Sequence, residues 1–128
     1  MEGSQKEQLD DIAKKVVGAA MEVLNELGNG FLEKVYENAL AIELRQRGLT
    51  VERQAELPVR YKGQNIGVYI PDLVVDDLVI IELKCVETFR KEHLAQCMNY
   101  LAITGFKLCM LLNFQRTRLE WRRVVNGI

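Results

Sequence analysis

The strongest constraint on the fold is a pair of continuous apolar runs that are separated by one helix. The runs are "LVIIELKC" at residues 78–85 and "KLCMLLNF" at residues 107–114. Strands that are apolar on both faces are typical of the centre of a sheet that helices cover on each side. The residues between them, about 90–104, are helical in pattern, and a strand–helix–strand connection of this kind is parallel and right-handed. The sequence therefore predicts an α/β sandwich.

The remaining elements surround this unit. Apolar residues at steps of three and four predict helices over about 5–27 and 31–47, and glycines follow each of them. Extended runs at 51–61 and 66–75 are joined by the turn "YKGQN", and "LEWRRVV" is typical of an edge strand. The predicted order is ααβββαββ, with a mixed sheet of about five strands. At 128 residues, we expect the whole chain, 1–128, to form a single domain.

Composition restricts the location and the cysteine chemistry. No apolar run approaches the roughly 20 residues that span a bilayer, so we expect no membrane segment. The start of the chain, "MEGSQKEQLDDIAKK", is polar and acidic, and this predicts no signal peptide. The cysteines at positions 85, 97 and 109 form no CxxC pair and are expected to be reduced core residues. Together these features predict a cytoplasmic protein.

The charge distribution is uneven although the net charge is only −1. From Gly105 onward there are five basic residues against one acid, so this tail carries a formal charge of +4 and the rest of the chain −5. A local basic stripe can bind phosphate groups even on an acidic protein. The alternative is a solvated outer strand. The arginines that we expect to contact nucleic acid are Arg116, Arg118, Arg122 and Arg123.

Three charged residues are unexpected in the apolar hairpin "IPDLVVDDLVIIELK". Glu82 and Lys84 are two residues apart on one strand, so they share a face. Whether Asp72 joins them depends on the length of the turn. A two-residue turn at Asp76-Asp77 leaves Glu82 facing away, whereas a three-residue turn or a bulge pairs 72 with 82 and brings the three groups together.

Two adjacent carboxylates in a partly buried site repel each other, and a divalent cation relieves that repulsion. Oxygen ligands with an open, hydrated coordination sphere suit Mg²⁺ or Mn²⁺. Such a cation polarises a phosphodiester and activates a water molecule, and Lys84 beside it could orient that water. The alternative is a surface ion pair between Glu82 and a nearby basic side chain.

Polar residues on two predicted helices accompany the hairpin. In "HLAQCMNYL", the spacing of three and four places His93, Gln96 and Tyr100 on one helix face that could overlook the site. A half-exposed face with Tyr100 packed in the core is the alternative. In "GFLEKVYENAL", Glu33 and Tyr36 lie near the start of the second helix, where a glutamate also simply favours the helix dipole.

In this order the motifs resemble a known family. "GFLEKVY" looks like the motif that names the GxxExxY proteins, "IPDLVVDDLVIIELK" resembles the PD-(D/E)xK core of the restriction-endonuclease-like nucleases, and "HLAQCMNYL" is similar to the QxxxY helix of their RecB-like branches. The resemblance implies a restriction-endonuclease-like fold. It also implies that Asp72 and Glu82 are metal ligands, that Lys84 is the catalytic lysine, and that Glu33 supports the metal. Gln96 and Tyr100 would organise the site.

The hypothesis that follows is a Mg²⁺- or Mn²⁺-dependent nuclease that acts on DNA or RNA. One alternative is a non-catalytic protein of the same fold that binds nucleic acid or a protein partner. Another is an interaction module whose long first helix docks a partner or a second copy. The intact set of Asp72, Glu82 and Lys84 favours the first hypothesis. The broad apolar stripe of the first helix also predicts a self-association face, most often that of a two-fold homodimer.

Overall fold

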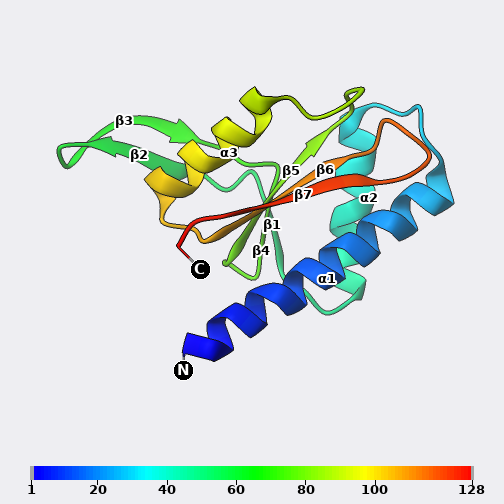
Figure 1. Cartoon of the computed structure of the whole chain (residues 1–128), viewed down its shortest axis with the longest axis horizontal. Helices are drawn as coiled ribbons and strands as arrows, with labels where there is room; N and C mark the ends of the chain where they lie inside the picture. Colours follow the sequence, from blue (N-terminus) through cyan, green and yellow to red (C-terminus); the bar gives the residue numbers. More distant parts are fainter. Residues whose placement is uncertain (1, 128) are drawn as a thin grey trace.

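A computed structural model describes residues 2–127, with side chains from residue 5 onward, as three helices and seven strands (Figure 1). None of the described helices is long and apolar enough to cross a membrane. The elements in chain order are α1 (Glu2–Leu27), α2 (Glu33–Gln46), β1 (Val51–Arg53), β2 (Leu57–Tyr61), β3 (Gln64–Tyr69), β4 (Leu73–Val75), β5 (Val79–Lys84), α3 (Lys91–Thr104), β6 (Leu108–Asn113) and β7 (Glu120–Val125).

The main sheet has five strands in the order β1-β4-β5-β6-β7. Strands β5 and β6 are parallel and the other pairs are antiparallel, so the sheet is mixed. The predicted α/β sandwich is confirmed, as are the central position of residues 78–85 and the edge position of the last strand.

The predicted element order was wrong in one respect, because each long extended run is divided into two strands. In the first run, Gln54 has a left-handed backbone with φ of 59°, and this residue ends β1. In the second run, Pro71 has no backbone N–H for a ladder, and it lies between β3 and β4. Strands β2 and β3 therefore leave the main sheet and form a separate hairpin beside α3 (Figure 1).

Helices cover both faces of the sheet, as the apolar runs predict. On one face, the alternate β5 residues Val79, Ile81 and Leu83 pack in one core with buried residues of α1 and α2. On the other face, Ile80 packs with Leu101 of α3. Figure 1 shows α1 and α3 on opposite sides of the sheet.

The apolar stripe of α1 packs in the core that α1 and α2 form with one face of the sheet. Leu27 at the end of α1 is 39% exposed. The other residues of the stripe are almost fully buried against the sheet and α2, namely Leu9, Ile12, Ala13, Val16, Ala19, Ala20, Val23 and Leu24. The predicted dimer rested on surplus apolar surface along this stripe, so the structure gives that prediction no support.

The turn between β4 and β5 has three residues. Leu73 pairs with Ile81 and Val75 with Val79, which leaves residues 76–78 between the strands. Asp76 and Asp77 adopt left-handed backbones with φ of 51° and 55°, a conformation that aspartate tolerates better than most residues. The same register, continued by one residue, sets Asp72 opposite Glu82. Of the two turn lengths considered above, the structure has the one that brings these carboxylates together.

Candidate active site

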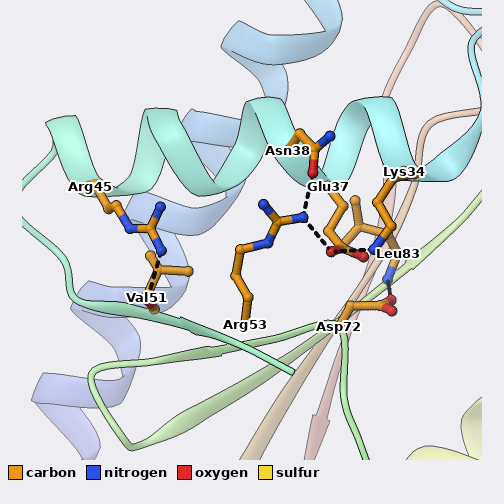
Figure 2. Close-up of polar contacts among 8 residues, drawn as sticks. All are labelled: Lys34, Glu37, Asn38, Arg45, Val51, Arg53, Asp72 and Leu83. Carbon is orange, nitrogen blue, oxygen red and sulfur yellow. Dashed lines mark hydrogen bonds and ion pairs between the residues drawn. The ribbon is translucent and has the colours of Figure 1, made fainter. Parts of the chain in front are cut away.

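The central feature of the site is a pair of carboxylates on neighbouring strands. Glu82 lies in β5, and Asp72 immediately precedes β4. The Asp72 carboxylate turns back to the sheet, where its Oδ2 accepts a hydrogen bond of 2.8 Å from the backbone N–H of Leu83 (Figure 2). This bond fixes Asp72 beside Glu82, and Lys84 follows on the same face of β5 as Glu82.

Both carboxyl groups are harder to ionise here than on an exposed surface. Burial, and then the negative charge of Asp72, raise the pKa of Glu82 to about 7. Burial also raises the pKa of Asp72, although the Leu83 N–H opposes this effect. The Lys84 ammonium lowers the pKa of both groups, which places its charge close to the pair. At neutral pH the pair therefore retains part of a proton that two exposed carboxyl groups would have lost.

This arrangement fits a hard divalent cation. A cation can take the place of the retained proton, because oxygen donors that repel each other are ligands of the kind that Mg²⁺ and Mn²⁺ prefer. Among the side chains that the structure describes, no three acidic, histidine or cysteine residues are grouped so as to hold one metal ion. A cation held by Asp72 and Glu82 would complete its coordination with water and substrate oxygens, as is common for Mg²⁺.

Glu33 lies close to the end of β5 but is directed at the backbone. It is the first residue of α2, and its Oε2 accepts a hydrogen bond of 3.2 Å from the N–H of Cys85, the residue after Lys84. The bond anchors the start of α2 at the edge of the site. The role of Glu33 toward a metal stays a prediction.

Tyr36, the last residue of the "GFLEKVY" motif, has a structural role. Its side chain is fully buried, and its ring stacks on Phe114 with centroids 4.8 Å apart. The hydroxyl donates to the carbonyl of Gly28 at 2.7 Å and accepts a bond of 3.2 Å from the N–H of Phe31. Tyr36 thereby holds the connection between α1 and α2 and fixes where α2 begins.

A buried acid that the motifs do not include, Glu37, lies one helical turn beyond Glu33. Its Oε2 contacts Lys34 at 3.1 Å and Arg53 at 2.9 Å (Figure 2). Its negative charge contributes to raising the pKa of Asp72, so it lies close to that carboxylate. Glu37 also lines a cavity of about 270 Å³ with Asp72. The spacing of four from Glu33 was the available signal in the sequence, because it puts both acids on one face of α2.

Gln96 and Tyr100 of α3 are connected to the site through Tyr69, a residue that none of the sequence motifs includes. Gln96 Nε2 donates to the Tyr100 hydroxyl at 2.9 Å, which confirms that the two side chains share a face. The Tyr100 ring stacks on Tyr69, with centroids 3.5 Å apart, and the Tyr69 hydroxyl donates to Glu82 Oε1. Glu82 is therefore bound to a buried tyrosine rather than to a surface cation.

His93 contacts the start of its own helix rather than Tyr69 or Tyr100. Its Nδ1 accepts a hydrogen bond of 3.0 Å from the N–H of Arg90, the residue that caps α3. The imidazole thus stabilises the start of the helix.

The four arginines of the basic tail do not lie on one surface. Glu82 pairs with Leu111 and Leu111 with Arg122, so Arg122 shares the face of Glu82 two strands away, about 10 Å at the usual spacing of strands. Arg123 lies on the opposite face, where it pairs with Asp10 of α1. Arg116 and Arg118 are exposed in the loop between β6 and β7. Only Arg122 of this set is on the face of the carboxylates.

Stability should depend on pH in a direction that the raised pKa of Glu82 determines. Between the unfolded value of 4.5 and about 7, the folded protein keeps a proton that the unfolded chain releases. The free energy of unfolding of the chelator-treated protein is therefore expected to fall as pH rises through this window, by up to about 3 kcal/mol at about 1.4 kcal/mol per pKa unit.

Glu82→Gln should flatten this fall and should be more stable than wild type at pH 8, as measured by denaturant unfolding at pH 5 and pH 8. Glu26→Gln, an exposed glutamate of α1, is the matched control and should leave the fall unchanged. If the free energy of unfolding changed equally with pH in wild type and Glu82→Gln, the pKa of Glu82 would not be raised in the folded protein.

Comparisons with known proteins agree with this fold. The family model described as the PD-(D/E)XK nuclease superfamily matches residues 10–124. The structure is similar to that of an alkaline exonuclease, LHK-Exo, from Laribacter hongkongensis, with a TM-score of 0.50 and 14% identity over 84% of this chain and 76% of that one. For LHK-Exo in complex with dAMP the TM-score is 0.51 and the identity 13%, over 90% and 83%. No curated protein matches the sequence. At such identities the likeness shows the fold.

Proposed function

This chain belongs to the PD-(D/E)XK nuclease superfamily, and we propose that it hydrolyses phosphodiester bonds of DNA or RNA with Mg²⁺ or Mn²⁺ held by Asp72 and Glu82. The observation that carries the proposal is the register of β4 and β5, which sets these two carboxylates side by side with Lys84 on the same face. Within the superfamily we assign the chain to the GxxExxY proteins, on Gly30, Glu33 and Tyr36.

Each residue of the site has a distinct part in this proposal. Asp72 and Glu82 hold the cation, and the Leu83 N–H keeps Asp72 in place. When bound, the cation would neutralise charge on the phosphate and lower the pKa of a coordinated water. Lys84 would orient the attacking water and stabilise the charge that develops on the phosphate.

Residues around the carboxylate pair would handle the substrate. Gln96 and Tyr100 would face the nucleic acid from α3. Arg122 is the tail arginine with the best position to contact a phosphate, because it shares the face of Glu82. Glu33 would support the cation from the start of α2, where it already contacts the backbone beside Lys84.

The test is an assay of the purified chain on end-labelled single- and double-stranded DNA and on RNA, with Mg²⁺, with Mn²⁺ and with a chelator. We expect cleavage that requires the metal, because the carboxylate pair alone offers no activated water. The lengths of the labelled products separate cleavage from an end from internal cleavage. A protein that binds the substrates but leaves all of them intact with both metals would favour a non-catalytic binding module of the same fold.

A further inference from the structure

Tyr69 makes a direct contact with one of the two proposed ligands. It is the last residue of β3 and is only 7% exposed, and its hydroxyl donates to Glu82 Oε1. A tyrosine phenol is protonated at neutral pH, so Tyr69 is a hydrogen-bond donor to the carboxylate. The bond to one oxygen fixes the orientation of the Glu82 carboxylate. Its second oxygen remains available to a cation shared with Asp72.

Tyr69 is itself held by the helix on the same face of the sheet. Its ring lies nearly parallel to that of Tyr100, with an interplanar angle of 12°. Tyr100 is in turn bound by Gln96, one turn earlier in α3. The contacts therefore form a continuous series from Gln96 through Tyr100 and Tyr69 to Glu82. The hairpin of β2 and β3, which lies outside the main sheet, brings Tyr69 into this series.

We propose that Tyr69 is a positioning residue that orients the Glu82 carboxylate for the cation shared with Asp72, and that the Tyr100 ring keeps Tyr69 in that position. The inference rests on the proposed metal site. Hydrogen-bond partners of metal ligands fix the orientation of those ligands, and their loss commonly weakens metal affinity about 10- to 100-fold. Tyr69 would act on the metal through Glu82 without touching the metal or the substrate.

The experiment measures Mn²⁺ affinity by calorimetry in the absence of nucleic acid. Tyr69→Phe keeps the ring and its stacking but removes the hydroxyl, so the Kd for Mn²⁺ is expected to rise about 10-fold or more. Tyr61→Phe is the matched control, since it also removes only a phenol hydroxyl, and Tyr61 is exposed at the far end of the same hairpin, where it pairs with Gln64. Its Kd for Mn²⁺ should equal that of wild type.

Substitutions of Tyr100 test the second part of the proposal. Tyr100→Leu removes the stacked ring and should weaken Mn²⁺ binding about as much as Tyr69→Phe does. Tyr100→Phe loses only the bond from Gln96 and should keep most of the affinity. The Kd for Mn²⁺ of the double variant Tyr69→Phe/Tyr100→Leu should not exceed the higher Kd of the two single variants, because both changes act through the same contact.

The outcomes separate this inference from the proposed function. A Kd for Tyr69→Phe within twofold of wild type would overturn the role of Tyr69, whatever the protein does to nucleic acid. Weakened Mn²⁺ binding in Tyr69→Phe supports that role even if wild type proves inert, in which case the proposed nuclease function fails alone. A wild-type protein that binds no Mn²⁺ at millimolar concentrations would overturn both.

Discussion

Asp72→Asn and Glu82→Gln are each expected to lose nearly all metal-dependent hydrolysis, by about 1000-fold or more. Each variant removes one of the two charged ligands, and the cation's stabilisation of the transition state is worth several kcal/mol, at about 1.4 kcal/mol per tenfold in rate. Both substitutions keep the shape of the side chain. The loss should appear in single-turnover rates on end-labelled DNA or RNA, together with a large loss of Mn²⁺ affinity in calorimetry.

The matched control is Asp77→Asn. Asp77 lies in the turn that joins the same two strands, and its side chain is exposed. This variant should cleave at the wild-type rate. Glu82→Gln carries a further internal control, because it is expected to be more stable than wild type at pH 8. A variant that is more stable and yet inactive cannot owe its inactivity to unfolding. Full activity in either ligand variant would contradict the metal site.

The sequence predicted the fold class because the decisive signals are local. The apolar runs of β5 and β6 and the helix between them specify a parallel pair that is covered on both faces, and this arrangement is present. The division of the longer extended runs was not predicted. In the first run it depends on the conformation of a single residue, Gln54, and on the hairpin of β2 and β3 packing against α3. In the second run, Pro71 was a local signal that the sequence already contained.

The register of Asp72 and Glu82 could be reduced to two options but not decided from the sequence. The segment "DDL" is compatible with either turn length. In the structure, the backbone N–H and the hydroxyl of Thr50 donate to Asp76 Oδ1 at 2.8 and 2.9 Å. Thr50 is 26 residues away in the chain. A contact at that separation helps to hold the turn, and local propensity contains no information about it.

Other parts of the site differ in whether they could have been foreseen. Tyr69 and Glu82 are 13 residues apart on segments that do not pair with each other, so their contact depends on tertiary packing. The separation of Arg122 from Arg123, in contrast, follows from alternation along a strand. The prediction of one basic stripe was therefore wrong for Arg123, which the structure places against Asp10 on the other face.

At a pH above 7, Lys84→Met is expected to retain metal binding and to lose about 100- to 1000-fold in the rate of hydrolysis. Methionine keeps much of the apolar stem, whereas the ammonium that would stabilise developing charge is gone, and deletion of one such group typically has an effect of this size. The prediction therefore separates Lys84 from the two carboxylates, whose loss should abolish binding and rate together.

The choice of pH decides whether this separation is visible. The Lys84 ammonium lowers the pKa of both Asp72 and Glu82, so Lys84→Met should raise those pKa values and make protons compete better with the cation near neutrality. A higher pH weakens the competition from protons, so the Kd for Mn²⁺ should approach that of wild type as the pH rises above 7. The single-turnover rate at saturating Mn²⁺ should remain low at that pH. A rate that recovers along with metal affinity would mean that Lys84 acts only by keeping the ligands ionised, and its proposed role at the attacking water would be wrong.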